Sequence, residues 1–162
     1  MSMIKEDVLQ LLDSQGICYD LSEHGPVYTI EEIDALQLKN TDCIAKNLFI
    51  RDDKKRQYFL LTVQKDKRAD LKQLQARLGT RKLSFASEVD LGSILGLTKG
   101  EVTPLGVLND QEHRVTVLLD TAFQDKLIGV HPNTNTATVW LQAGNLFRLV
   151  EQHGNMVQWI EV

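Results

Sequence analysis

The chain has 162 residues, of which 43% are hydrophobic and 25% are charged, and its formal net charge is −4. This composition is typical of an ordinary globular protein, so we expect residues 1–162 to form one domain that folds without a metal or a disulfide. The acidic balance argues against tight, sequence-blind nucleic-acid binding, which usually depends on a basic surface.

The first half of the chain contains both helical and strand-like patterns of apolar residues. Thr29 followed by Glu32 is a capping-box pattern and predicts the start of a helix. The charged turn at 51–55, between two apolar runs, predicts a β-hairpin. In chain order, we expect a helix over 2–15, a strand over 17–21, a helix that begins after residue 29, strands over 43–50 and 58–63, and a helix over 70–78.

The second half continues the same mixture. Ser87 is a favourable N-cap residue, and Gly96 is placed to end the helix that follows it. In chain order, we expect a helix over 87–95, a loop over 100–104, strands over 105–108 and 115–119, a helical turn over 121–126, a segment over 128–135, a strand over 137–141, a helix over 144–152 and a strand over 156–161. Strand pairs mixed with helices, rather than strict alternation, predict a mixed sheet with helices packed on it.

The two cysteines, Cys18 and Cys43, lack the spacing of metal ligands, and both lie at or beside apolar, strand-like runs. We expect both to be buried free thiols in a reducing compartment. The first residues lack the hydrophobic region of a secretory signal, and no segment approaches the ~20 apolar residues that span a bilayer. The sequence therefore predicts a cytoplasmic location and no membrane partner.

Several common catalytic signatures are absent from the sequence. There is no P-loop, no dinucleotide-binding glycine fingerprint, no metalloprotease helix and no nucleophile elbow. The histidines are scattered along the chain, and none is paired at metal-ligand spacing. If the protein is an enzyme, we expect it to work without a metal or a bound cofactor.

Lys46 and Asn47 interrupt the apolar run from Ile44 to Ile50. Burying an ammonium group in a strand is unfavourable, so a lysine at this position suits the binding of a phosphate or a polarised carbonyl. The alternative is a lysine on an edge strand that discourages aggregation. The strand pattern alone leaves both interpretations open.

The segment from Gly100 to Pro104 is the second candidate. Glycine allows the backbone to approach a ligand closely, and proline fixes φ at the far end of the loop. Backbone amides exposed in such a loop can bind a carbonyl oxygen or a developing oxyanion. The alternative is a plain connection between a helix and a strand.

The segment from His131 to Asn135 is the third candidate. A histidine that precedes a proline is held extended, so its ring can project over a pocket. The asparagines and threonines that follow offer neutral hydrogen-bonding groups. The alternative is an Asn/Pro turn between two strands.

Together these three segments resemble the YbaK-like aminoacyl-tRNA editing domains, a family that includes the editing insertion of bacterial prolyl-tRNA synthetases and freestanding relatives. Their order and separation agree with that family, and the resemblance covers essentially the whole chain. The matching segments are Ala45-Lys46-Asn47-Leu48-Phe49, Gly100-Glu101-Val102-Thr103-Pro104 and His131-Pro132-Asn133-Thr134-Asn135-Thr136-Ala137-Thr138. The resemblance implies an α/β (α+β) fold with a mixed, partly barrel-like central sheet, helices around it, and a pocket where the three segments meet.

The resemblance also implies roles for individual residues. Lys46 would hold the 3′ end of the tRNA or the ester through its charge, and His131 would line the pocket beside the aminoacyl group; these are the two predicted catalytic residues. Asn47 would support the pocket or the substrate, and the loop from Gly100 to Pro104 would orient the ester and set the size of the pocket. Asn135 matches a later position of the pattern and is grouped with the substrate-binding residues.

The first and third segments are most similar to those of deacylases that remove alanine from proline tRNA. The implied function is trans-editing, in which a mischarged tRNA(Pro), most simply Ala-tRNA(Pro), is hydrolysed without a cofactor. A Cys-tRNA(Pro) or other small-amino-acid deacylase, a non-catalytic tRNA- or synthetase-associated module, and a small-molecule enzyme on the same fold remain open. Transient contact with prolyl-tRNA synthetase or an elongation factor is a further expectation.

A basic cluster in the middle of the chain is the candidate contact surface for the tRNA. Its alternative is a solvated helix face. The members are Lys65, Lys67, Arg68, Lys72, Arg77, Arg81 and Lys82.

Overall fold

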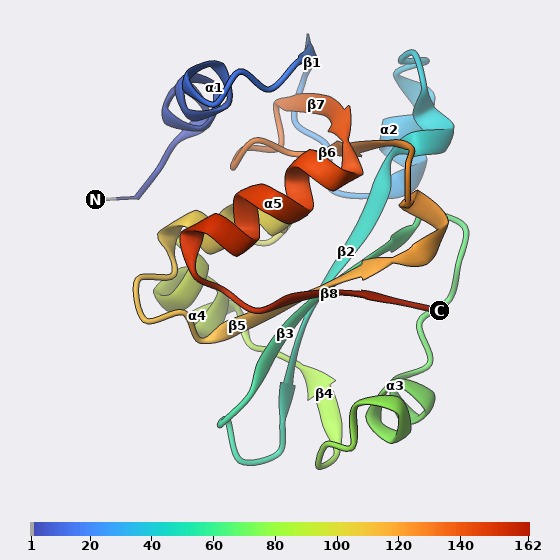
Figure 1. Ribbon diagram of the computed structural model, residues 1–162. Helices are drawn as coiled ribbons and strands as arrows, with labels where there is room; N and C mark the ends of the chain where they lie inside the picture. Colours follow the sequence, from blue (N-terminus) through green and yellow to red (C-terminus); the bar gives the residue numbers. More distant parts are fainter. Residues whose placement is uncertain (1) are drawn as a thin grey trace.

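The computed structural model describes residues 2–162 and contains two β-sheets with helices packed against them (Figure 1). The helices are α1 (Lys5–Ser14), α2 (Ile30–Ala35), α3 (Leu71–Leu78), α4 (Glu88–Asp90) and α5 (Ala143–His153). The strands are β1 (Tyr19–Glu23), β2 (Ala45–Asp52), β3 (Tyr58–Gln64), β4 (Leu83–Phe85), β5 (Val115–Asp120), β6 (Leu127–Val130), β7 (Ala137–Gln142) and β8 (Val157–Ile160). Shorter helical turns are η1 (Thr41–Cys43), η2 (Leu91–Leu95), η3 (Pro104–Asn109) and η4 (Thr121–Phe123).

The larger sheet has the strand order β4-β2-β3-β5-β8, and the smaller sheet has the order β1-β7-β6. In the larger sheet β2 is antiparallel to β3 and β4, whereas β3, β5 and β8 run parallel. This confirms the expected α+β architecture with a mixed sheet. Within residues 2–162 the sheets do not close into a barrel, because they are joined by an isolated bridge between Ile44 and Gly129 rather than by a continuous ladder.

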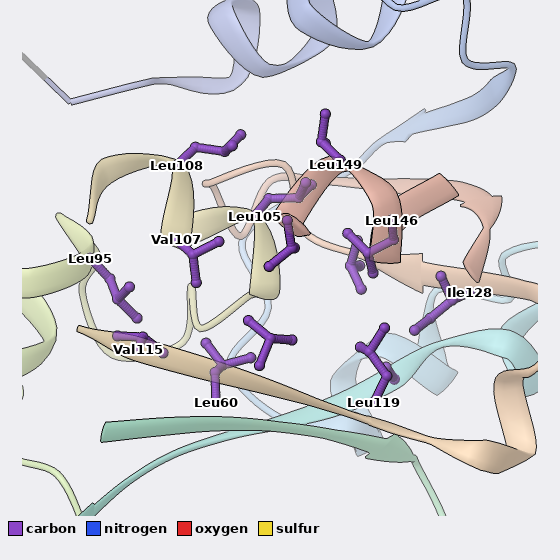
Figure 2. Close-up of a cluster of buried hydrophobic side chains, with 14 of the residues drawn as sticks. Leu60, Leu95, Leu105, Val107, Leu108, Val115, Leu119, Ile128, Leu146 and Leu149 are labelled. Atoms are coloured by element: carbon purple, nitrogen blue, oxygen red, sulfur yellow. The ribbon is translucent and has the colours of Figure 1, made fainter. Parts of the chain in front are cut away.

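The main apolar core lies between the two sheets, where α5 contacts both β7 and β8 (Figure 1). Figure 2 shows Leu60 of β3 and Leu119 of β5 on one side of this core, with Ile128 of β6 and Leu146 of α5 on the other. All four side chains are 0% exposed. Full burial of each such side chain stabilises the fold by about 1.5–3 kcal/mol, so this layer holds the two sheets at a fixed distance.

Local sequence signals explain where several helices begin and end. Thr29 caps α2, as expected, because its Oγ1 accepts a hydrogen bond from the Glu32 N–H at 3.1 Å. Asp70 accepts two backbone hydrogen bonds at the start of α3, and Gly79 ends this helix in the left-handed region with φ of +65°. These caps give the helices boundaries close to those predicted.

The prediction of a strand over 105–108 is wrong, because these residues lie in the 3₁₀ helix η3. Thr103 caps this turn by accepting a hydrogen bond from the Leu105 N–H at 3.3 Å, and Pro104 occupies its first position. The run is buried on all sides, and a short apolar run of this kind does not distinguish a strand from a helical turn.

Two further expectations need correction. Cys18 is exposed and Cys43 is half-buried, so the prediction of two buried thiols is wrong. The strand β4 was not predicted, since it has only three residues and too short a pattern to show alternation. None of the helices in residues 2–162 has the length and apolar character that crossing a bilayer requires.

One half of β2 lacks a strand partner on its outer side. β3 pairs with β2 from Ala45 to Arg51, whereas β4 pairs only with the far end, from Ile50 to Asp52. Residues 45–48, here called the open edge of β2, therefore have a continuous strand ladder on one side only, while β6 approaches the start of β2 at the bridge between Ile44 and Gly129. Backbone groups at such an edge are available to other partners.

Candidate functional site

A cavity of about 180 Å³ lies at the open edge of β2. Its wall contains Lys46 and Asn47 from β2, Gly100 from the loop before η3, and His131 from the turn after β6. The structure thus brings together residues from all three segments that the sequence singled out. The opposite wall comes from α2 and the residues before it, namely Val27, Tyr28, Thr29, Ile30 and Ile33.

Lys46 is held at the cavity by a hydrogen bond from its Nζ to the Lys67 backbone carbonyl. Lys67 is itself fixed, because its own Nζ lies 2.9 Å from the carboxylate of Asp120, whose side chain is 0% exposed. An ammonium group has three N–H donors. The carbonyl therefore orients Lys46 and leaves two donors for a ligand.

Asn47 is oriented by Thr62 on the neighbouring strand. Thr62 Oγ1 donates to Asn47 Oδ1 at 2.7 Å, so the donor side of the Asn47 amide is left for a ligand. On the outer side of β2, the Phe49 carbonyl accepts a hydrogen bond from the Ala86 N–H at 2.9 Å. Residues two apart in a strand point their backbone groups in the same direction, so the N–H and C=O of Asn47 also face the open edge.

Gly100 allows the loop before η3 to pass close to Tyr28. Its φ of +92° lies in the left-handed region, and a Cβ at this position would lie 2.6 Å from Cδ1 of Tyr28. Glu101 fixes the same turn, because its Oε1 accepts hydrogen bonds from the Thr98 N–H at 2.9 Å and from the Thr98 hydroxyl at 2.8 Å. The backbone at Gly100 can therefore form part of the cavity wall without a side chain in the way.

Thr103 connects the glycine–proline loop to the histidine turn. Its buried Oγ1 donates to the His131 backbone carbonyl at 2.6 Å. This bond joins the two segments directly and fixes the spacing between them beside the cavity. Pro104 is buried at the start of η3 and is not part of the cavity wall.

His131 has a defined tautomer. Its Nδ1 lies 3.0 Å from the Ala137 carbonyl oxygen, and a carbonyl only accepts, so Nδ1 carries the proton and Nε2 is left as an acceptor. Burial lowers the pKa of His131 below its ordinary value of 6.5, and the hydrogen bond to Ala137 opposes this shift in part. Near neutral pH the cavity therefore contains an uncharged imidazole.

A smaller recess continues inward from the cavity. It shares Asn47 and His131 with the cavity and is closed by Ile44, Gly129 and Thr138. Its volume is about 10 Å³, which is room for about one water-sized group. The recess is therefore small enough to exclude a long side chain.

The segment before α2 was not recognised from the sequence as part of the site. His24 Nε2 lies 3.0 Å from the Thr138 hydroxyl, and the His24 ring centroid is 6.5 Å from that of His131. The only sequence signal in this segment was the helix cap at Thr29. That signal places the start of α2 but does not say which cavity the helix adjoins.

Asn135 is nearly buried and is not part of the cavity wall. Its backbone carbonyl accepts a hydrogen bond from the Val27 N–H at 3.2 Å. Val27 does line the cavity. In this structure Asn135 therefore holds the segment before α2 in place through its backbone.

Three members of the basic cluster have acidic partners. The ion pairs are Lys65 with Asp34 at 2.6 Å, Lys67 with Asp120 at 2.9 Å and Arg81 with Asp53 at 2.6 Å. The positive charge of these three side chains is thus compensated locally. The members that are exposed without such a pair in the described part of the chain are Arg68, Lys72, Arg77 and Lys82.

The groups that line the cavity are suited to binding an acyl group. Residues 2–162 bring no three His, Cys, Asp or Glu side chains close enough to hold an ion. They offer a cation, an amide, backbone donors and a neutral imidazole around a small apolar recess. Such groups can bind and polarise an ester carbonyl.

Comparison with protein families agrees with this chemistry. The family described as the aminoacyl-tRNA editing domain matches residues 24–149, which include all the cavity residues named above. The class of protein is therefore an aminoacyl-tRNA editing hydrolase. The chain belongs to the aminoacyl-tRNA editing domain family.

Several relatives match over nearly the whole chain. The chain is 47% identical over 159 residues to the prolyl-tRNA editing protein ProX of Acetoanaerobium sticklandii, covering 98% of this chain and 97% of that protein. It is 36% identical over 150 residues to the prolyl-tRNA synthetase associated domain-containing protein 1 of Danio rerio, covering 91% of this chain and 79% of that protein. The resemblance stated from the sequence is therefore confirmed.

Solved structures show the same fold. A crystal structure described as a candidate trans-editing enzyme for prolyl tRNA synthetase superposes with a TM-score of 0.73 at 20% identity, covering 100% of this chain and 99% of that one. The crystal structure of hypothetical protein APE2540 superposes with a TM-score of 0.72 at 18% identity, covering 93% of this chain and 95% of that one. At these identities the likeness concerns the fold alone.

Proposed function

We propose that residues 1–162 act as one editing domain that hydrolyses the ester of mischarged tRNA(Pro), with Ala-tRNA(Pro) as the preferred substrate. The observation that carries this proposal is the cavity that joins Lys46, Asn47, Gly100 and His131 and narrows to a recess of about 10 Å³. Proline tRNA is suggested by the names of the relatives, which refer to prolyl-tRNA editing and to prolyl-tRNA synthetase.

In this proposal Lys46 and Asn47 bind the ester. The two remaining donors of the Lys46 ammonium group face a developing negative charge or a phosphate of the terminal nucleotide. The backbone N–H of Asn47, at the open edge of β2, is placed to donate to the ester carbonyl. A positioned donor that stabilises an oxyanion contributes about 3 kcal/mol to lowering the barrier.

His131 recognises the amino acid. Because Nδ1 carries the proton, Nε2 can accept a hydrogen bond from the α-ammonium group of the substrate. The low pKa of His131 prevents the repulsion that an imidazolium would exert on that ammonium group. This places the side chain of the amino acid toward the recess that His131 also lines.

The reaction is the attack of water on the ester carbon, with cleavage of the bond to the ribose oxygen. The oxygen of the leaving ribose takes up a proton, and the products are free alanine and deacylated tRNA. We infer that the adjacent ribose hydroxyl of the terminal adenosine orients the water. Replacing that hydroxyl with hydrogen is expected to slow hydrolysis strongly, and an unchanged rate contradicts this part of the mechanism.

Selectivity is steric in this proposal. One additional methylene changes binding in an apolar pocket by roughly 1–3 kcal/mol. Alanine places a single methyl group in the recess, whereas the ring of proline exceeds it. Serine and glycine esters are expected to be hydrolysed more slowly than the alanine ester, because their fit to the recess is poorer.

The test is incubation of the protein with alanyl-, cysteinyl- and prolyl-tRNA(Pro), followed by measurement of the remaining ester. The expected result is rapid loss of the alanine ester and no loss of the proline ester. Faster loss of the cysteine ester would instead identify a cysteine deacylase. Binding without loss of any ester would identify a non-catalytic tRNA-binding module.

A further inference from the structure

A second groove of about 310 Å³ adjoins the cavity. The two hollows share Asn47 and Val102, so these residues form a common rim. The floor of the groove is apolar and includes Phe49 and Leu91. Its volume is at the lower end of the range typical of small-molecule sites.

Phe85 stands at this groove with its ring exposed to water. It ends β4 and is 61% exposed, although its backbone is paired with Ile50. It does not belong to any of the apolar clusters of the core. The fold therefore gains little from a phenyl ring at this position, which leaves it available to contact a ligand.

The charged groups of the groove differ in sign. Lys99 and Glu88 both line it and both are exposed. Lys99 supplies a cation at the groove that Phe85 also lines, and grooves that combine cations with aromatic rings are typical of surfaces that bind single-stranded nucleic acids. Glu88 can accept a hydrogen bond from an amino group but repels a phosphate, so a nucleotide has one favourable orientation here.

We propose that this groove binds the terminal adenine base of the tRNA, stacked on the ring of Phe85, while the amino acid occupies the cavity across the rim formed by Asn47 and Val102. The ribose and its ester lie at the rim. The phosphate lies near Lys99, and the amino group of adenine lies near Glu88. This inference rests on the function proposed above, because it assigns a second part of the same substrate.

The geometry of the substrate supports this assignment. In an aminoacyl-adenosine, the ribose carries the amino acid on one side and the base on the other. The protein has its hollows in the same order: a small cavity for the amino acid, a shared rim for the ribose, and a wider apolar groove for the base. An aromatic side chain beside a groove with a cation is the usual platform for an unpaired base.

The test compares two synthetic substrates. One is the alanyl ester of adenosine 5′-monophosphate, and the other is the alanyl ester of ribose 5-phosphate, which lacks the base. Phe85→Ala is expected to lower kcat/KM about 10-fold for the adenosine ester and to leave that for the ribose ester unchanged. Phe85→Tyr is expected to restore the wild-type value, because the tyrosine ring also stacks.

Val89→Ala is the matched control, since Val89 is 78% exposed on α4 but does not line the groove. This variant is expected to leave kcat/KM unchanged for both substrates. An equal decrease of kcat/KM for both substrates in Phe85→Ala, or no decrease for either, would overturn the proposal. Thermal unfolding of each variant establishes that the fold is intact.

Failure of the proposed function is distinguishable from failure of this inference. If the wild-type protein hydrolyses no ester, adenosine 5′-monophosphate is titrated instead, and the NMR signals of the Phe85 ring are followed. Upfield shifts of the ring protons, lost binding in Phe85→Ala and kept binding in Phe85→Tyr support the groove as a base-binding site. A titration that leaves the Phe85 signals unchanged contradicts it.

Discussion

The two halves of β2 belong to one continuous strand but have different surroundings. The half from Ile50 to Asp52 is paired with β4 on its outer side and, as far as Arg51, with β3 on the other, whereas the half from Ala45 to Leu48 has a continuous ladder with β3 but none on its outer side. The half that is paired with β4 contributes Ile50, which is 0% exposed, to the core. The half at the open edge contributes Lys46 and Asn47 to the cavity. The site therefore lies where the outer strand pairing of β2 stops and its backbone groups become available.

The largest effect on the hydrolysis rate is expected from a substitution at the open edge of β2. Lys46→Ala is expected to lower the rate of ester hydrolysis by about 100-fold or more, because it removes a positioned donor at the ester. The rate is measured on mischarged tRNA(Pro) under single-turnover conditions. Thermal unfolding is expected to change little by comparison, since Lys46 contributes one partly buried hydrogen bond to the fold.

Arg51→Ala is the matched control on the paired half. Arg51 Nη1 donates to the carbonyl of its neighbour Asp52 at 2.8 Å, and Arg51 does not line the cavity. This variant is expected to keep nearly the wild-type rate. Similar losses of rate in Arg51→Ala and Lys46→Ala would show that charge on β2, rather than position at the open edge, matters.

The next largest effect is expected from loss of the hydrogen bond between Thr103 and the His131 carbonyl, which joins the glycine–proline loop to the His131 turn. Thr103→Val is expected to lower the hydrolysis rate about 10-fold, because the His131 turn loses its connection to the glycine–proline loop. It is also expected to lower the free energy of unfolding by about 1–3 kcal/mol, because the partly buried His131 carbonyl is left without its donor. Single-turnover assays and urea denaturation measure the two effects.

Thr80→Val is the control for Thr103→Val. Its hydroxyl donates to the Arg81 carbonyl at 2.9 Å in an exposed turn. It is expected to change stability by less than about 0.5 kcal/mol and to leave the rate unchanged. A Thr103→Val protein with full activity would contradict the connection between the two loops.

Gly100→Ala is expected to act on both stability and activity. The alanine Cβ would enter the ring of Tyr28 and the residue would keep a left-handed φ, at a cost of about 1–3 kcal/mol. Gly79→Ala is the matched control, with φ of +65° but no atom within 4 Å of the added Cβ. Of these two variants, only Gly100→Ala is expected to lower the hydrolysis rate. Adding Tyr28→Ala to Gly100→Ala is expected to restore part of that rate, because the clash with the ring is removed.

The smallest expected effect is a dependence of stability on pH. The unfolded chain protonates His131 near pH 6.5, whereas the folded chain does so only at a lower pH because burial lowers the pKa of His131. Between these two values the unfolded state binds more protons, so the free energy of unfolding falls as the pH falls.

His131→Gln removes this titration. As the pH drops below about 6.5, the wild-type protein is expected to lose stability relative to the variant, as measured by urea denaturation at several pH values. Parallel pH profiles of the two proteins would show that His131 is not held neutral by burial.

The sequence predicted most of the fold because most elements have strong local signals. The hairpin of β2 and β3 follows from two apolar runs around a charged turn, and α3 follows from the amphipathic pattern over 70–78 and its end at Gly79. The turn η3 was mistaken for a strand because its residues are buried on every side. The division into two sheets was also not predictable, because pairing between distant strands leaves no local pattern.

The candidate site was predictable to the extent that it depends on short motifs. Lys46, Asn47, Gly100 and His131 were named from the sequence, and the structure brings all of them to one cavity. The opposite wall from Val27 to Ile33 was missed, because it reaches the cavity through tertiary packing and carries no chemical signature.

The most direct test of the account is an NMR titration with a non-hydrolysable analogue, the alanyl amide of 3′-amino-3′-deoxyadenosine. The backbone amide signals of Asn47, Gly100 and His131 are expected to shift together with one dissociation constant. Binding of the analogue without a shift at these three residues would contradict the claim that the open edge of β2 and the two loops form a single site for an aminoacyl ester.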